Sequence, residues 1–345
     1  MGTLKASPQP IDGSTPLAAD AVPLQSVFLH VTKACNLNCS YCYFSARRPM
    51  RDEMSAAEFS SLWPQLVEAN ASKVVFTGGE PLLRPDIITL LSGLRNADPG
   101  HHVIRCLNSN GHLVTPTLAG ELVGLVDEVR VSLDGFAKQN DVFRGAGNFD
   151  AAMRALEIYR AVGLDPKVLL TITRQTVPDL EEFLIFLIGR GFISINVHRF
   201  RPFGRGRKHE EWCASGVEIK QPIRRALARF GAAETAPPDS GEEDSRHHCG
   251  VGRFLNIMPN GDVFPCHVLI DPEFRCGNVR TQSLLDICRR TGLLGELAGL
   301  DFRTMARQEP GVMDLTRVDA CLGAVYAGNR DLRVWRDHLS LPLVQ

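Results

Sequence analysis

Short apolar, β-branched runs alternate along the chain with longer stretches in which apolar residues recur at the helical period. This alternation is typical of an α/β fold with a parallel sheet built from strand–helix units. Six such units would not close an eight-stranded barrel, but their chemistry should still collect on loops after the carboxyl ends of the strands. The strands are expected at residues 26–32, 73–77, 102–108, 127–133, 166–173 and 193–199.

Capping residues and prolines predict where the helices begin. Ser55 is a plausible N-cap of a helix over 56–68, because Glu58 stands at the capping-box position. Each of the first four predicted helices fits one crossover between strands. The other helices are expected from Pro85 to Leu94, after Asp150 to Ala161, from Pro178 to Arg190-Gly191, and from Glu218 to Phe230.

Composition divides the 345-residue chain into two modules. Residues 1–25 are expected to form a flexible N-terminal segment, and residues 26–231 the barrel module. The Pro-rich, acidic stretch 232–246 is interpreted as a linker. Residues 247–345 form a second, smaller module.

The bulk numbers exclude several classes of function. A net charge of −1 leaves no electrostatic footprint for nucleic acid or for an anionic membrane. Residues 1–25 lack the pattern of a signal peptide, and no stretch has the roughly 20 apolar residues of a membrane span. We therefore expect a cytoplasmic protein with a small-molecule or peptide substrate. Its ten cysteines indicate metal or redox chemistry rather than a disulfide framework.

Three of these cysteines, Cys35, Cys39 and Cys42, lie within eight residues, just after a β-branched run that ends at Thr32. Three thiolates so close together can hold three irons of a 4Fe-4S cube and leave the fourth iron open to a small molecule. The alternative is a structural zinc site, which normally needs four ligands, and no second cysteine pair lies nearby.

The Cys-x3-Cys-x2-Cys spacing resembles the fingerprint of the radical S-adenosylmethionine (SAM) superfamily. That resemblance implies a partial (βα)6 TIM-like barrel, with the family's motifs covering about residues 26–200. In that family the open iron chelates the amino and carboxylate groups of SAM. An electron from the cluster cleaves SAM to methionine and a 5′-deoxyadenosyl radical, which abstracts hydrogen from the substrate.

Further motifs end the second, third and fourth strands. Gly78-Gly79-Glu80 resembles the family motif that contacts the amino group of SAM, with Glu80 as the acceptor. Asn110 lies in an Asn-Gly turn like one near the family's SAM site. Ser132 and Arg144 match residues that contact the SAM carboxylate in relatives, a role that suits the paired donors of a guanidinium.

The second module begins with a predicted hairpin, because Asn260-Gly261 lies between two apolar runs. Its spacing, from Cys249 through Gly261 to Cys266, resembles the opening of a SPASM/Twitch auxiliary-cluster domain. The resemblance implies a small β-hairpin plus helix module that binds a second 4Fe-4S cluster. The shorter Twitch form fits better, because the dense C-terminal cysteine cluster is absent. The expected ligands are Cys249, Cys266 and Cys321, with the fourth left open between Cys276, a non-cysteine group and substrate; a hairpin without a cluster is the alternative.

The remaining cysteines, Cys106, Cys213 and Cys288, are more often small buried hydrophobes than ligands. Cys213 nevertheless follows the sixth strand, near the expected barrel mouth, where a thiol can return a hydrogen atom to a substrate radical. The segment 201–207, just before it, is basic and Gly-rich.

The leading hypothesis is a radical SAM oxidoreductase or epimerase that tailors a small natural-product metabolite, such as a sugar or aminocyclitol. It is favoured because only about 25 residues precede the first strand, too few for a leader-binding domain. The alternative is a maturase of a ribosomal peptide or of a tetrapyrrole-type cofactor. A hypothesis of another class is a noncatalytic zinc- or cluster-binding interaction protein. For the enzyme, an electron donor such as flavodoxin or ferredoxin is expected.

Overall fold

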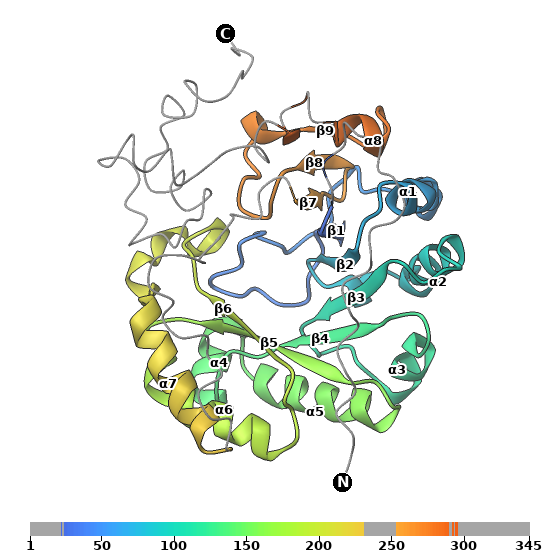
Figure 1. Ribbon diagram of the computed structural model, residues 1–345. Coiled ribbons are helices and arrows are strands. Elements are labelled where there is room, and N and C mark those ends of the chain that lie inside the picture. The colour runs from blue at the N-terminus through green and yellow to red at the C-terminus, as the bar shows by residue number, and fades with distance from the viewer. Residues whose placement is uncertain (1–21, 23, 231–252, 290–291, 293, 296–345) are drawn as a thin grey trace.

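The computed structural model describes residues 22, 24–230, 253–289, 292, 294 and 295. Within these residues, nine strands form one curved sheet in the order β6-β5-β4-β3-β2-β1-β7-β8-β9, with helices packed outside it (Figure 1). All pairs from β6 through β1 to β7 are parallel. The prediction of an α/β fold with a parallel sheet is therefore confirmed.

All six predicted strands are present, and their ends lie within two residues of the expected positions. The predicted strand boundaries are accurate because polar or turn residues lie at both ends of each strand. The strands are β1 (Ser26–Thr32), β2 (Lys73–Gly78), β3 (Ile104–Ser109), β4 (Glu128–Ser132), β5 (Pro166–Ile172) and β6 (Ile195–Arg199).

The helices start where capping groups are available. Ser55 and Glu58 form the predicted capping box of α1 (Ala56–Glu68). Ser215 and Glu218 form another, so α7 begins at Gly216 rather than at Glu218. The other helices are α2 (Ile87–Ala97), α3 (Pro116–Leu122), α4 (Ala137–Arg144), α5 (Asn148–Ala161), α6 (Leu180–Gly189), α7 (Gly216–Ala228) and α8 (Leu284–Ile287).

Three predicted helix starts were wrong by a few residues. Pro85 precedes α2, whose N-cap is Asp86. Asp150 lies inside the first turn of α5, where an acidic side chain favours the positive helix end, rather than before the helix. Pro178 lies in the short 3-10 turn Val177–Asp179 that leads into α6. Two further helices, α3 and α4, were not predicted; they are only 7 and 8 residues long.

The two faces of the sheet differ in burial. On β5 the residues alternate between buried and half-buried, and the buried set, Val168, Leu170 and Ile172, belongs to the main hydrophobic cluster. Successive side chains of a strand point to opposite faces, so this set packs against the outer helices. The half-buried set, which includes Lys167 and Thr171, lines the inner face of the curved sheet.

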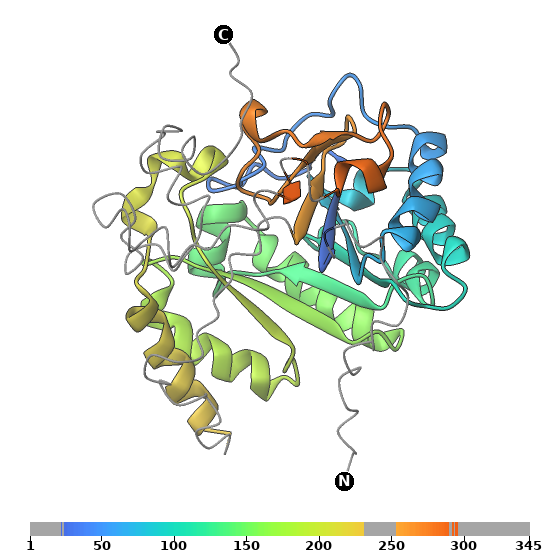
Figure 2. The same ribbon diagram turned by 45° about the horizontal axis from the view of Figure 1, so that its top comes forward.

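The second module continues the sheet of the barrel. Strand β7 (Phe254–Ile257) pairs in parallel with β1, and the predicted hairpin joins it to β8 (Asp262–Phe264), which pairs with β9 (Gly277–Asn278). Figure 2 shows these strands directly beside β1. The predicted module boundaries at 231 and 247 fall outside the described residues and remain predictions.

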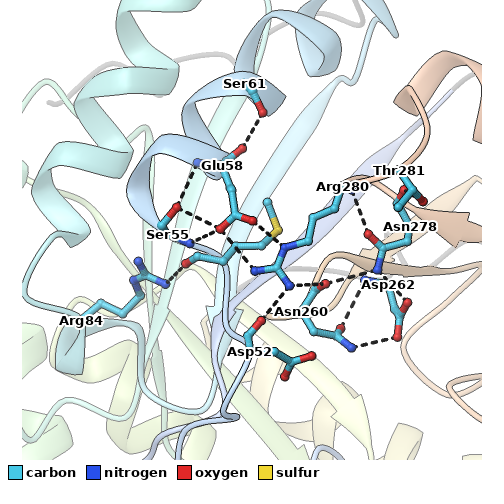
Figure 3. Close-up of polar contacts among 11 residues, drawn as sticks. Asp52, Ser55, Glu58, Ser61, Arg84, Asn260, Asp262, Asn278, Arg280 and Thr281 are labelled. Atoms are coloured by element: carbon cyan, nitrogen blue, oxygen red, sulfur yellow. Dashed lines mark hydrogen bonds and ion pairs between the residues drawn. The ribbon is translucent and has the colours of Figure 1, made fainter.

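Arg280, which follows β9, fastens this hairpin to α1 (Figure 3). Its Nε donates to Glu58 Oε1 at 2.6 Å, and its Nη1 donates to the backbone oxygens of Asp52 at 2.9 Å and Asn260 at 3.2 Å. One guanidinium thus connects the capping box of α1 with the turn between β7 and β8.

Candidate active site

The three predicted cluster ligands, Cys35, Cys39 and Cys42, lie on the long loop that follows β1, here called the cysteine loop (residues 33–53). All three are partly exposed free thiols. Glu53 ties the ends of the loop together, because its carboxylate accepts hydrogen bonds from Lys33 N at 2.7 Å and Met50 N at 2.9 Å.

The chemistry of the loop fits an iron–sulfur cluster. Cys35 Sγ accepts a hydrogen bond from Leu37 N at 3.4 Å, as cluster thiolates commonly do. Burial raises the pKa of the Cys35 thiol to about 11 and also raises that of Cys39. Deprotonation of these thiols is therefore expected to accompany iron binding. Among the described residues, no group of three His, Cys, Asp or Glu side chains forms a site for a single metal ion.

Gly78 and Gly79 press directly against the start of the cysteine loop. Gly78 has φ +126°, and a Cβ there would overlap the carbonyl oxygen of Thr32; a Cβ on Gly79 would overlap that of Ala34. The close approach lets Gly79 N donate to Thr32 O, and Glu80 N to Ala34 O, both at 2.8 Å. Two glycines are needed here because the two backbones touch.

Glu80 is buried behind these glycines, with 1% of its surface exposed. Its carboxylate accepts hydrogen bonds from Ser109 Oγ at 2.9 Å, Asn110 N at 2.8 Å and Leu82 N at 3.2 Å. Burial raises the pKa of Glu80 to about 7, against these hydrogen bonds, which lower it. A carboxylate offers about four acceptor sites, so one remains for a ligand cation such as an amino group.

Asn110, at the end of β3, also contacts the cysteine loop. Its Nδ2 donates to Asn36 Oδ1 at 2.7 Å and lies 4.0 Å from Cys35 Sγ. The structure therefore brings Asn110, Glu80 and the glycine pair together around the first cysteine, as the motifs suggested.

Arg144 has a partner, Asp134, that the sequence motifs did not predict. Its Nε and Nη2 donate to the two oxygens of the buried Asp134, at 2.6 and 3.1 Å. The Tyr41 hydroxyl of the cysteine loop also donates to Asp134, and the guanidinium lies 5.5 Å from the Tyr41 ring centre. Despite burial, which lowers it, the neighbouring Asp134 raises the pKa of Arg144 well above its ordinary value. Ser132 ends β4, two residues before Asp134.

The inner face of the sheet carries one carboxylate among three cations. Glu128 lies 3.2 Å from Lys73 Nζ, 2.9 Å from Lys167 Nζ and 2.6 Å from Arg130 Nη2. Burial opposes ionisation, but hydrogen bonds from Lys167, Arg130 and Cys106 hold the pKa of Glu128 well below its usual range. Positive charge therefore exceeds negative charge in this cluster.

Cys213 follows β6, just after the 3-10 turn Glu210–Trp212, and is partly exposed. Burial raises the pKa of its thiol, while Arg199 and Arg201 at the carboxyl end of β6 act in the opposite direction. The segment that carries this thiol leaves the carboxyl end of β6, and the role of Cys213 as a hydrogen donor remains a prediction.

Two of the predicted auxiliary-cluster ligands, Cys249 and Cys321, lie outside the described residues. Cys266 is buried after β8, and its Sγ accepts a hydrogen bond from Leu269 N at 3.4 Å. Burial raises the pKa of Cys276 to about 12, and the thiols of Cys288 and Cys266 add to the rise. The second module thus places Cys276 near both Cys266 and Cys288. Cys106 and Cys288 are buried, as expected.

Family models match most of the barrel and the start of the second module. A model described as the radical SAM superfamily matches residues 29–187, and one described as an iron-sulfur cluster-binding domain, SPASM, matches residues 249–311. Among the described residues, no helix has the length and apolarity needed to cross a membrane.

The chain is similar to several characterised proteins. It is 31% identical over 283 residues to mycofactocin maturase MftC of Mycobacterium tuberculosis, covering 77% of this chain and 71% of that protein. It is 27% identical over 293 residues to the AdoMet-dependent heme synthase of Nitratidesulfovibrio vulgaris, which covers 76% of this chain and 77% of that protein. Its fold resembles SuiB of Streptococcus suis bound to precursor peptide SuiA, with a TM-score of 0.69 and 19% identity over 81% of this chain and 68% of SuiB.

Proposed function

The chain belongs to the radical SAM superfamily, and from this premise we propose that it is a maturase that modifies a ribosomally made peptide. The observation that carries the proposal is the 31% identity to a mycofactocin maturase over 71% of that protein's length. The expected preference for a sugar or aminocyclitol gains no support from the relatives named above.

The family's cofactors are a 4Fe-4S cluster and SAM, and its SPASM domain implies an auxiliary cluster. We propose Cys35, Cys39 and Cys42 as the ligands of the first cluster. Cys249, Cys266 and Cys321, with Cys276 as a candidate fourth, are the proposed auxiliary ligands. When bound, the first cluster supplies the electron that splits SAM into methionine and a 5′-deoxyadenosyl radical.

The protein's own residues would orient SAM at its two charged groups. Glu80 would accept from the amino group, beside the backbone of Gly78 and Gly79 and near Asn110. Arg144 and Ser132 would bind the carboxylate. Asp134 occupies Nε and Nη2 of Arg144, which leaves Nη1 for that carboxylate and fixes the plane of the guanidinium.

A cationic cluster at the amino ends of β2, β4 and β5, across the barrel from the SAM motifs, supports a substrate that is long enough to place an anionic group there. Lys73, Arg130 and Lys167 share the single carboxylate of Glu128, and the two lysine side chains remain 24% and 29% exposed. A substrate carboxylate bound there would balance the excess charge. We expect Lys73→Met to raise KM for such a substrate more than it lowers kcat, because the lysine lies on the opposite end of β2 from Gly78.

A tetrapyrrole is the second candidate substrate. It is favoured by the 27% identity to an AdoMet-dependent heme synthase over 77% of that protein. Tetrapyrrole side-chain carboxylates would satisfy the same cations, so the charge of the inner face does not separate the two candidates.

Anaerobic reconstitution tests the proposal. We expect the full chain, reduced by dithionite or by a flavodoxin or ferredoxin, to form 5′-deoxyadenosine, and the triple variant Cys35→Ala/Cys39→Ala/Cys42→Ala to form none. Co-expression with short reading frames that flank its gene, followed by mass spectrometry, should yield a modified peptide. Modification of an added iron porphyrin instead would favour the second candidate. Bound zinc without SAM cleavage would support a noncatalytic protein and overturn both.

A further inference from the structure

The basic, Gly-rich segment after β6 reaches back to the cysteine loop. Arg205 donates from Nε to Cys39 O at 2.8 Å, from Nη1 to Ala46 O at 2.9 Å, and from its backbone N to Cys42 O at 3.0 Å. Arg205 thus binds the backbone of two of the three cysteines and that of Ala46, which follows them in the same loop. A guanidinium suits this task because its donors are fixed in one plane.

Gly204 makes this contact possible. It has φ +54°, and a Cβ at this position would overlap the carbonyl oxygens of Tyr43 and Cys42. Gly206 is also closely packed, since a Cβ there would lie 2.9 Å from the Phe200 ring. The two backbones touch at Gly204, as they do at Gly79 on the other side of the loop.

The contact joins loops that follow the first and the last of the six barrel strands. Strands β1 and β6 are separated by four strands and do not pair with each other. Figure 1 shows the cysteine loop extending from β1 toward β6. Arg205, which follows β6, donates to the loop at Cys39 O. Arg205 therefore connects the loops that follow β1 and β6, although the two strands themselves do not pair.

We propose that Gly204 and Arg205 form a clamp that holds the cysteine loop in its cluster-binding conformation and keeps a positive charge beside the cluster. This inference rests on the proposed function only in assigning the cluster to this loop. The loop contains no helix or strand of its own between β1 and α1, and only single turn bonds from Cys42 N and Ser45 N reach the carbonyls of Cys39 and Cys42 from within it. Arg205 adds a second donor to each of these two carbonyls and, unlike a lysine, stays charged and planar.

The clamp predicts two separable effects on the cluster. Loss of a supporting contact outside the ligand set typically weakens metal binding about 10- to 100-fold. Loss of a nearby positive charge disfavours the reduced, more negative cluster and lowers its midpoint potential. We therefore expect Arg205→Gln to show both effects. Arg205→Lys should keep most of the potential but still lose iron faster.

The experiment uses the full-length protein, reconstituted anaerobically. The first readout is the rate of iron loss to a chelator, and the second is the midpoint potential of the electron paramagnetic resonance signal that changes when SAM is added. Arg207→Gln is the control, because the Arg207 side chain is 47% exposed and its ion-pair partner at 3.7 Å, Asp271, is not part of the cysteine loop. We expect about tenfold faster iron loss in Arg205→Gln and wild-type behaviour in Arg207→Gln.

Gly204→Ala tests the clamp independently of charge. We expect faster iron loss with little change in potential, whereas Gly124→Ala should match the wild type, because Gly124 also has a positive φ but no atom within 4 Å of its Cβ position. Wild-type iron retention and potential in both Arg205 variants would overturn the clamp. If Arg205→Gln does not fold, the rate of iron loss from Arg205→Lys tests the clamp instead. A wild-type protein without any SAM-responsive signal would instead refute the proposed function.

Discussion

His30 lies on β1 with no exposed surface, and its Nε2 is 3.0 Å from Asn256 Oδ1 on β7. Burial lowers the pKa of His30 to about 4, with the neighbouring His267 acting in the same direction. Between pH 6.5 and 4 the unfolded chain binds more protons at this position than the folded chain. Stability should therefore fall as pH falls through this window, by about 3 kcal/mol for a shift of this size.

His30→Gln should remove this contribution, because glutamine keeps a donor for Asn256 but does not titrate. Urea unfolding at a series of pH values would show a shallower slope between pH 6.5 and 4. His102→Gln is the matched control, since the His102 side chain is 64% exposed. An unchanged slope in His30→Gln would show that His30 does not cause the loss of stability between pH 6.5 and 4.

Gly79→Ala tests the close contact between the glycine motif and the cysteine loop. The added Cβ would overlap the carbonyl oxygen of Ala34, so the loop must move. Overpacking of this kind costs about 1–3 kcal/mol. We expect lower thermal stability and weaker SAM binding, measured by calorimetry. Gly189→Ala, on α6 with no atom within 4 Å, should leave both unchanged or slightly raise stability; equal behaviour of the two variants would contradict the packing argument.

At the scale of elements, the contact between Arg280 and Glu58 fixes the β7–β8 hairpin to α1 (Figure 3). The two side chains remain 28% and 39% exposed, so the pair itself should contribute about 0.5–1 kcal/mol. A double-mutant cycle with Arg280→Met and Glu58→Gln, followed by urea unfolding, measures this coupling. Arg280→Met alone should cost more, because it also leaves the carbonyls of Asp52 and Asn260 without this donor.

Arg289→Met provides the comparison for the cycle. Its partner Asp286 lies 2.8 Å away and three residues earlier in the chain, and both side chains are more than half exposed. We expect a change of only a few tenths of a kcal/mol. A coupling energy near zero between Arg280 and Glu58 would mean that hydrophobic packing alone holds the β7–β8 hairpin against α1.

Element boundaries show where sequence patterns fail. The six strands were predicted well because alternating or continuous apolar runs end at polar turn residues. Helix starts were less accurate at Pro85, Asp150 and Pro178, because the group that caps a helix depends on the conformation of the preceding turn. Short α4 was missed since its eight residues are mostly polar, and its position depends on Asn140, Phe143 and Arg144 being buried against the rest of the fold.

At the scale of the molecule, the second module completes the barrel sheet. Leu255 and Ile257 of β7 are fully buried in the main hydrophobic cluster, and β7 covers the edge of β1. A fragment that ends at residue 230 would expose that edge and the apolar surface beneath it. We expect such a fragment to aggregate or to lose its cooperative thermal transition, as seen by gel filtration and circular dichroism.

Point variants of the full chain separate this effect from truncation itself. Leu255→Ala should destabilise the protein by about 2–5 kcal/mol, because it leaves a cavity between β7 and the core. Val217→Ala, at a position 66% exposed on α7, should have little effect. A monodisperse fragment with the transition temperature of the full chain would show that the barrel folds independently of β7.

The sequence by itself determined the positions of the six barrel strands, the three-cysteine motif, the Gly-Gly-Glu motif and the hairpin of the second module. Each of these features depends on residues that are near one another in the chain, so their spacing and turn residues are enough to predict it. The tertiary structure alone decided the pairing of Arg144 with Asp134, the pairing of β7 with β1, and the contact of Arg205 with the cysteine loop. These contacts join segments 10 to more than 200 residues apart, and their geometry depends on how the whole sheet curves.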